Sequence, residues 1–367
     1  MKTLLALALL APLAAGCSDG AASPTPTDAG AVDVPTTRDA GDDAPAANDV
    51  SVGVDTPSVA DAGAPVDASP TALRRCPQTG RGALLGDHCF LLTPTETGLG
   101  PTGVNANFDH YALRPRGAAR GQLMVFFNGS GGHPLGVIAS PNTNLYASAR
   151  DAGLHVLALS YRSDEAIATL CASSADRDAC FFATRMTLMS GRFQTGASSA
   201  LADITLGEGV YARLAMALRY LATRDPDGGW EQFLGDTAGE DPTRYFVWSR
   251  IVAAGHSQGS GHAALLGRLH PLDRVLAFAG PCDQVQAMPA AWLRGPTAFA
   301  TDPATRFVGL GHPSDAICGQ YPAAWESLGL APSARITAQL CAGVGAHGAP
   351  IECVENAPLW ARMLAPR

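Results

Sequence analysis

The chain has no excess of basic residues: 33 acidic residues outnumber 25 basic ones. After Lys2 it has no lysine, so all of its other basic residues are arginines. The negative balance lies in residues 18–72, which contain ten aspartates and one basic residue, Arg38. From residue 73 onward, acidic and basic residues are equal in number, at 23 each. Proteins that bind nucleic acids by their phosphates need a basic surface, so we expect no nucleic-acid partner.

Residues 18–72 also have few large apolar side chains; alanine, aspartate, proline, threonine, valine and glycine dominate, and the triplet DAG recurs at 28, 39 and 61. Such a segment cannot bury enough apolar surface to offset the entropy of ordering, so we predict a disordered tether. The irregular spacing of its aspartates is not that of a calcium-binding loop.

The chain has no apolar run long enough to span a bilayer; its first residues, MKTLLALALLAPLAAGC, contain a shorter one. One lysine, an apolar stretch and small residues at the end indicate an export signal over residues 1–17. The ending LAAGC resembles the lipobox of bacterial lipoproteins. It departs from that pattern at one position: the usual leucine three residues before the cysteine is Ala14 here, and Leu13 stands four residues before it. The resemblance implies lipidation at Cys17 and a membrane-anchored exported protein; the alternative is ordinary secretion after cleavage nearby.

Residues 73–367 alternate apolar runs with amphipathic stretches. The runs lack period-two alternation, which is typical of strands covered on both faces in a parallel sheet; they occupy 122–127, 154–161, 246–255, 274–280, 306–311 and 335–340. Between them, Val210, Leu214, Ala217, Leu218 and Leu221 share one face of a predicted helix. We therefore predict an α/β fold with a mostly parallel sheet of about eight strands and helices on both faces.

Cysteines are even in number in this domain, and no two are spaced as CxxC, the arrangement typical of zinc sites. In an exported chain they indicate disulfides, with 105 connectivities that the sequence alone does not resolve. Short separations favour Cys76 with Cys89, Cys171 with Cys180 and Cys341 with Cys353, which leaves Cys282 with Cys318.

The stretch VAAGHSQGSG places Ser257 between Gly255 and Gly259, after a predicted strand and before a predicted helix. This strand–turn–helix context resembles the nucleophile elbow of the α/β-hydrolase superfamily, most closely its secreted esterase and lipase branch. The alternative is a glycine-rich packing turn with an idle serine. The resemblance extends over about residues 110–367 and implies an α/β-hydrolase fold with Ser257 as nucleophile.

The loop FFNGSGGHP, after the predicted strand at 122–127, looks like the oxyanion loop of that superfamily, with Asn128 where many relatives carry histidine. The resemblance places the oxyanion-binding backbone N–H groups at Ser130 and Gln258. The alternative is a plain glycine-rich turn.

The superfamily's order along the chain is serine, acid, histidine. Seven of the nine histidines precede Ser257 or lie on or beside its helix: His88, His110, His133, His155, His256, His262 and His270. Of the other two, His347 lies after the last predicted strand, where the base is expected, whereas His312 lies in the loop that usually carries the acid. Asp315 in that loop is the predicted acid, and Asp283, which follows the preceding strand, is the alternative. The alternative readings of His347 and Asp315 are a surface-loop histidine and a turn-forming aspartate.

These residues predict a serine hydrolase that cleaves small-molecule or lipid carboxylic esters through an acyl-enzyme, without a cofactor or metal. The segment 162–245 is longer than one crossover helix needs, and we expect a lid or pocket wall there. Two alternatives remain: an amidase or acyltransferase on the same residues, and a catalytically idle, surface-anchored binding module of the same fold.

Overall fold

The computed structural model describes residues 72–77, 85, 86, 88–99, 103–137, 144–236, 239, 241, 244–295 and 298–366. The predicted export signal with Cys17, and the predicted tether up to residue 71, lie outside the described residues.

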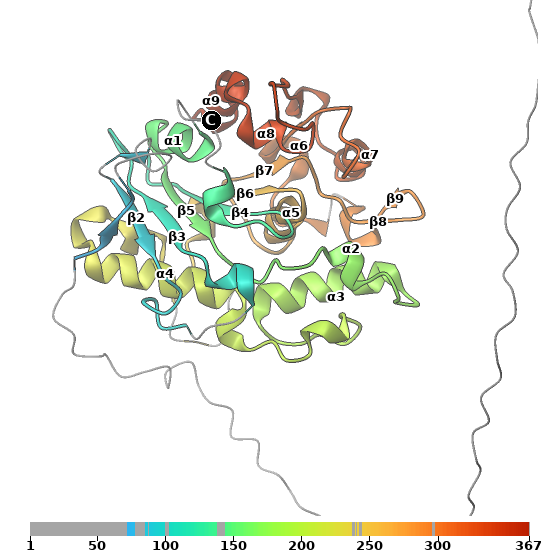
Figure 1. Ribbon diagram of the computed structural model, residues 1–367, viewed down its shortest axis with the longest axis horizontal. Helices are drawn as coiled ribbons and strands as arrows, with labels where there is room; N and C mark the ends of the chain where they lie inside the picture. Colours follow the sequence, from blue (N-terminus) through green and yellow to red (C-terminus); the bar gives the residue numbers. More distant parts are fainter. Residues whose placement is uncertain are drawn as a thin grey trace, which may run out of the picture. The chain divides into compact units, whose positions relative to one another are not determined.

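The domain is built on one nine-stranded sheet (Figure 1). Its strands, in spatial order, are β1 (Arg74–Arg75), β2 (Cys89–Leu92), β3 (His110–Leu113), β5 (His155–Leu159), β4 (Leu123–Phe127), β6 (Ile251–His256), β7 (Arg274–Phe278), β10 (Phe307–Gly311) and β11 (Arg335–Thr337). The six strands from β5 to β11 are parallel, whereas β1, β2 and β3 are antiparallel to their neighbours. A two-stranded hairpin, β8 (Gln284–Val285) and β9 (Met288–Pro289), follows β7.

Helices cover both faces of the sheet (Figure 1). They are α1 (Leu145–Asp151), α2 (Ile167–Leu170), α3 (Arg177–Ser190), α4 (Val210–Arg224), α5 (Gln258–Leu269), α6 (Pro303–Arg306), α7 (Tyr321–Ser327), α8 (Ala349–Glu352) and α9 (Ala357–Leu364). Alternate residues of β4 show how one strand serves both faces. Val125 belongs to a buried cluster with α3, α4 and α5, and Phe126 belongs to a second cluster with α1 and α9.

The predicted fold class is therefore confirmed, with nine strands in the main sheet. The predicted helix over 210–224 is confirmed as α4, whose apolar face is buried. All six strands predicted from apolar runs are shorter than expected, and β6 and β11 illustrate why. A 3₁₀ turn at Trp248–Arg250 precedes β6, and β11 ends at Thr337, which pairs with the last residue of β10, Gly311. The antiparallel strands β1, β2 and β3 are too short to give a clear pattern in the sequence.

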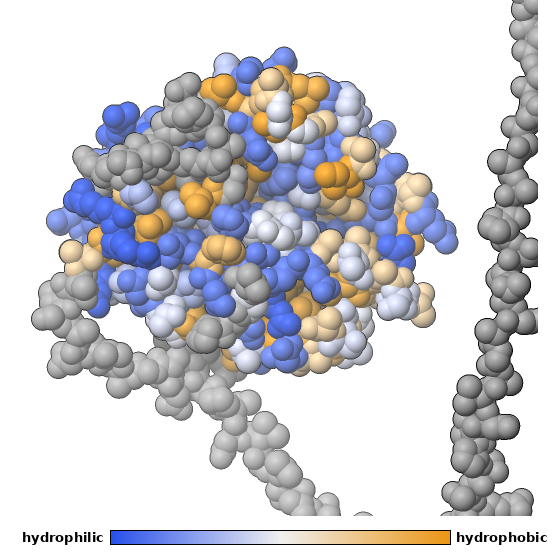
Figure 2. Space-filling model, in the orientation of Figure 1, coloured by the Kyte–Doolittle hydropathy of each residue, from blue (hydrophilic) through white to orange (hydrophobic). Residues whose placement is uncertain are grey.

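On the face of the molecule drawn in Figure 2, small clusters of hydrophobic residues lie among hydrophilic ones, as is usual for a surface in contact with water. Among the residues that the structure describes, no helix combines the length and apolar character needed to cross a membrane.

Several buried histidines make the stability of the domain dependent on pH, and His110 and His270 are two of them. The pKa of His110 falls to about 3 because burial, and to a lesser extent the nearby Arg213 charge, disfavour its protonated form. The pKa of His270, which stacks on Trp248, falls to about 4 because of burial. Both imidazoles are therefore neutral in the folded protein at neutral pH.

We expect the free energy of unfolding to fall as the pH drops from about 6.5 toward 4, by up to about 1.4 kcal/mol per pH unit for each of these two histidines. The sign follows because both folded pKa values lie below that of an exposed histidine, so the unfolded chain takes up protons first. Urea unfolding at pH 7, 6 and 5 measures the slope. His270→Phe should reduce the slope, and an unchanged slope would contradict this assignment.

Candidate active site

Ser257 lies on a sharp turn between β6 and α5 and has a φ of +55°, which is rare for a residue with a side chain. The glycines on either side make this turn fit. A Cβ on Gly255 would lie 2.2 Å from the Gly259 carbonyl oxygen, and a Cβ on Gly259 would lie 2.1 Å from the Phe127 carbonyl oxygen. Glycine at both positions therefore lets β4, β6 and α5 close around the serine, which is held in a strained backbone conformation.

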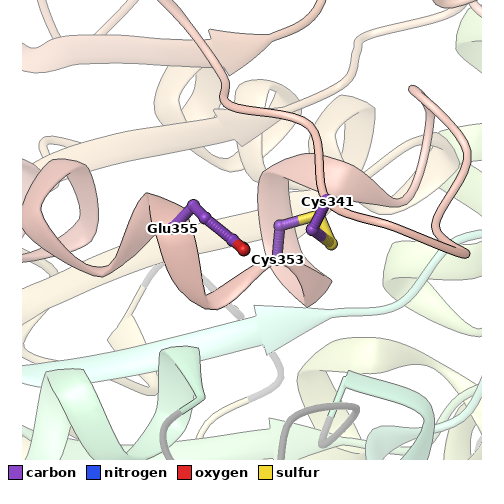
Figure 3. Close-up of side chains that lie close together, drawn as sticks. All are labelled: Cys341, Cys353 and Glu355. Carbon is purple, nitrogen blue, oxygen red and sulfur yellow. A yellow bond between two sulfur atoms is a disulfide. The ribbon is translucent and has the colours of Figure 1, made fainter.

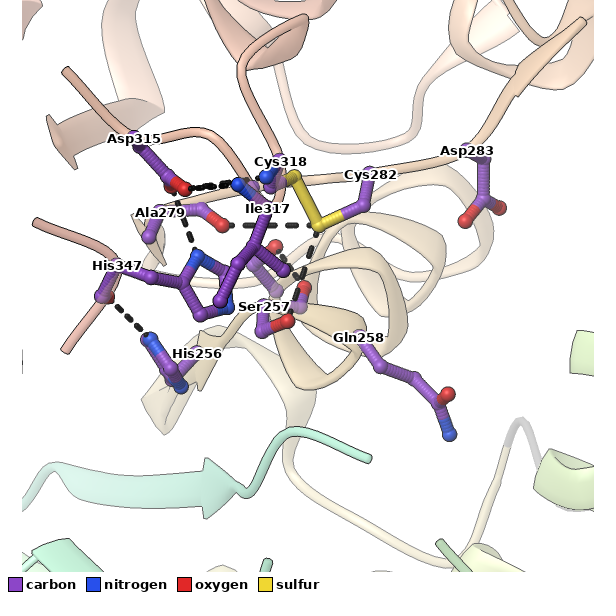
Figure 4. Close-up of a disulfide and its surroundings, with 12 residues drawn as sticks. His256, Ser257, Gln258, Ala279, Cys282, Asp283, Asp315, Ile317, Cys318 and His347 are labelled. Atoms are coloured by element: carbon purple, nitrogen blue, oxygen red, sulfur yellow. Dashed lines mark hydrogen bonds and ion pairs between the residues drawn. A yellow bond between two sulfur atoms is a disulfide. The ribbon is translucent and has the colours of Figure 1, made fainter. Parts of the chain in front are cut away.

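His347 and Asp315 are joined by a hydrogen bond of 2.8 Å between Nδ1 and Oδ2 (Figure 4). An ionised carboxylate can only accept, so Nδ1–H donates and the lone pair of Nε2 remains free to take up a proton. Asp315 Oδ1 accepts the backbone N–H groups of Ile317 and Cys318, at 2.9 and 3.1 Å. The buried carboxylate is thus fixed by three donors, and it fixes the imidazole in turn.

Ser257 and His347 line one cavity of about 550 Å³. In Figure 4 the imidazole lies between Asp315 and Ser257. No direct hydrogen bond joins the serine to His347 in this described region; Ser257 Oγ instead lies 3.8 Å from Cys282 Sγ. A rotation about the Cα–Cβ bond of the serine reorients its Oγ, and hydrogen bonds of this kind often form only when substrate is bound.

The loop after β4 packs directly against the serine: a Cβ on Gly129 would lie 3.0 Å from that of Ser257. Ser130 Oγ donates to the side-chain Oε1 of Gln258, at 2.7 Å, which ties this loop to the first residue of α5. Within the described part of the chain, neither the backbone N–H of Ser130 nor that of Gln258 donates to a protein acceptor. Both groups are therefore available to an oxygen atom of a ligand beside Ser257.

Asp283, the alternative acid, does not contact His347. Its carboxylate forms a bidentate ion pair with Arg185, at 2.6 Å from Nε and 2.5 Å from Nη2, and also accepts the indole N–H of Trp292. Arg185 extends from α3 and is almost completely buried. This aspartate therefore neutralises a buried guanidinium in the cavity wall, and both of its oxygens accept hydrogen bonds there.

His256, the residue before the serine, was set aside in the sequence by its position alone. Its Nε2–H donates to the backbone carbonyl of His347 at 2.7 Å and so supports the loop that carries His347 (Figure 4). Burial, together with the nearby His347, lowers the pKa of His256 to about 4, so it is neutral at neutral pH. The sequence hints at this contact only by placing His256 next to Ser257 in the GHSQG motif.

The structure contains the three disulfides that short separations favour, Cys76–Cys89, Cys171–Cys180 and Cys341–Cys353, and the pair that they leave, Cys282–Cys318. Two of them lie at the site. Cys282–Cys318 joins the loop after β7 to the loop that carries Asp315, and Cys341–Cys353 closes the segment that contains His347. Each of these two bridges thus cross-links a loop of the candidate site to a neighbouring segment, which restricts the conformations that the loop can adopt.

Cys341, Cys353 and Glu355 are close enough to resemble a metal site, because one potential ligand atom from each lies within 4.8 Å of the others. The two sulfur atoms are bonded to each other, however (Figure 3). Disulfide sulfurs are not the thiolates that bind metals, so this grouping is a cross-link with a nearby carboxylate.

No protein-family model and no curated protein sequence matches the chain. Solved structures similar to it include an α/β serine hydrolase homologue from Coxiella burnetii, with 16% identity, 76% of this chain and 98% of that chain covered, and a TM-score of 0.38. An α/β serine hydrolase without a lid from Xanthomonas campestris has 12% identity, coverages of 77% and 97%, and a TM-score of 0.38. Dienelactone hydrolase from Anabaena variabilis has 14% identity, coverages of 75% and 95%, and a TM-score of 0.35. With TM-scores below 0.5, these likenesses carry no argument about the substrate or activity of this chain.

Proposed function

We propose that the protein is a serine hydrolase that cleaves carboxylic esters through an acyl-enzyme intermediate. The observation that carries the proposal is the hydrogen bond between Asp315 and His347, which leaves Nε2 of His347 as a proton acceptor. His347 lines the same cavity as Ser257, the serine on the strained turn. A serine hydroxyl becomes a useful nucleophile only beside such a base.

In the proposed reaction, Ser257 Oγ attacks the ester carbonyl carbon while its proton passes to His347 Nε2. The resulting oxyanion accepts hydrogen bonds from the backbone N–H groups of Ser130 and Gln258. The intermediate collapses, and the alcohol leaves with the proton from His347. Water then attacks the acyl-enzyme, gives a proton to His347, and the carboxylic acid leaves as Ser257 regains its hydrogen.

A series of 4-nitrophenyl esters with acyl chains of increasing length tests the proposal. We expect turnover that rises to a maximum at an intermediate chain length, because a cavity of about 550 Å³ accepts a ligand of limited size. A rate no higher than that of the Ser257→Ala variant on every ester would contradict the proposal and leave the idle binding module in its place.

Four disulfides indicate an oxidising, extracytoplasmic compartment. We propose in addition that Cys17 carries the lipid anchor predicted from the sequence and that residues 18–72 tether the domain to a membrane. A flexible chain of that length has a root-mean-square reach of about 40 Å, so the domain could meet substrates away from the lipid surface.

If Cys17 is lipidated, the full chain should fractionate with membranes and be released by detergent but not by high salt. Cys17→Ser should move the protein out of the membrane fraction or leave its signal uncleaved, and the specific activity of the purified domain should not change. Recovery of the wild-type protein entirely in the soluble exported fraction would show instead that the chain is simply secreted.

A further inference from the structure

Two arginines of α3, Arg177 and Arg185, line the catalytic cavity. The charge of Arg185 is compensated by its bidentate pair with Asp283. Arg177, the first residue of the helix, has no such partner: none of the described carboxylates lies within ion-pair distance of it, and its buried Nε makes no hydrogen bond. The two guanidinium groups therefore differ in what they can offer a ligand.

The acidic residues beside Arg177 on the helix are used elsewhere. Asp176 caps the helix by accepting the backbone N–H of Ala179 at 3.0 Å. Asp178 accepts the backbone N–H of Ala291 at 2.7 Å and lies 3.7 Å from the Arg294 guanidinium. The remaining carboxylate of the cavity wall, Glu352, lies against Gly348 and makes contacts of its own.

Arg177 is also held in place. Its guanidinium carbon lies 5.8 Å from the centre of the Phe181 ring, one helical turn further along α3, so the ring supports the charged group. Ala166, Ile167 and Ala168, which line the same cavity, have uncharged side chains without a hydrogen-bond acceptor. A guanidinium does not lose its proton at any physiological pH, so the cavity carries a permanent positive charge there.

We propose that Arg177 binds an anionic group of the substrate, and that the natural substrate is an ester that also carries a free carboxylate, such as a monoester of a dicarboxylic acid. The inference rests on the proposed function, because it places the ester carbonyl at Ser257. A carboxylate matches the planar donor pair of one guanidinium and its single charge, whereas a phosphate monoester carries nearly two. The binding energy would select acidic esters over neutral ones of equal size.

The test compares two substrates that differ by one charge: 4-nitrophenyl hydrogen adipate and its methyl ester, both followed by release of 4-nitrophenolate above the uncatalysed rate. We expect the wild-type protein to have a kcat/KM at least about tenfold higher for the acidic ester. Arg177→Gln should lower kcat/KM for the acidic ester by about 10²-fold, mainly through KM, and for the methyl ester by less than about threefold. The matched control Arg192→Gln, which removes an exposed arginine just beyond the other end of α3, should change neither value.

Equal losses on both esters in Arg177→Gln, or a wild-type preference for the methyl ester, would overturn the inference and leave the proposed function standing. A second arm separates binding from catalysis. Calorimetry with monomethyl adipate on Ser257→Ala, with and without Arg177→Gln, should give a dissociation constant about 10²-fold weaker in the double variant. If neither aryl ester is hydrolysed but this difference remains, the proposed function fails and the anion site stands; if the difference is absent, the anion site fails.

Discussion

Replacing Ser257 by alanine is expected to lower kcat for ester hydrolysis by about 10⁴- to 10⁶-fold. The hydroxyl oxygen is the atom that forms the acyl bond in the proposed reaction, and the other serine that lines the cavity, Ser130, uses its hydroxyl to bind Gln258. The side chain makes one weak contact, to Cys282 Sγ, so its removal should leave the free energy of unfolding almost unchanged. Steady-state kinetics and urea unfolding of the same preparation measure the two quantities.

Ser333→Ala is the matched control for this variant. Ser333 is exposed in the short helix before β11, away from the residues that line the catalytic cavity. It should keep wild-type kcat and wild-type stability. Turnover by Ser257→Ala within tenfold of the wild-type rate would mean that another residue supplies the nucleophile.

Asp315→Asn is expected to lower kcat by about 10⁴-fold. An asparagine amide facing His347 Nδ1 presents a donor where the carboxylate presents an acceptor, so it favours the imidazole tautomer with hydrogen on Nε2, which cannot accept the serine proton. The backbone N–H groups of Ile317 and Cys318 would still have an acceptor in the amide oxygen, so the loop should keep its conformation.

Asp283→Asn is the matched comparison at the alternative acid. It should lower the stability of the domain strongly and kcat only slightly, whereas Asp315→Asn should do the reverse. The change leaves the buried Arg185 guanidinium without its counter-charge, which typically costs about 3–5 kcal/mol of stability when a buried pair is broken. The kcat of the molecules that remain folded should fall far less than in Asp315→Asn. If Asp283→Asn instead removes turnover and Asp315→Asn does not, the acid lies after β7.

Much of the candidate site could be predicted because its features follow from a local motif or from the position of a residue relative to the strands. Gly255 and Gly259 mark the turn around Ser257, since any larger residue there would overlap backbone atoms of α5 and β4. The position of His347 after the last strand and of Asp315 after the preceding one brings both loops to the same end of a parallel sheet. The 2.8 Å hydrogen bond between them is the contact that their predicted roles require.

Other features depend on residues that are distant in the sequence. Arg185 and Asp283 are 98 positions apart, and the residues next to Asp283 in the sequence do not distinguish it from a catalytic aspartate. The backbone carbonyl that His256 contacts is 91 positions away. The orientation of Ser257 Oγ toward Cys282 Sγ is set by side-chain packing, which no sequence pattern encodes. The difference between Arg177 and Arg185, two arginines on one helix, likewise emerges only from their surroundings in three dimensions.

Labelling with a fluorophosphonate probe, followed by peptide mapping, tests the central claim most directly. The probe reacts preferentially with a serine oxygen that a neighbouring base activates, so it reports the chemistry of Ser257 and His347 without assuming a substrate. The account predicts stoichiometric labelling of the peptide that contains Ser257, with none in Ser257→Ala and strongly reduced labelling in His347→Gln. A wild-type protein that stays unlabelled, or that is labelled at another serine, would contradict it.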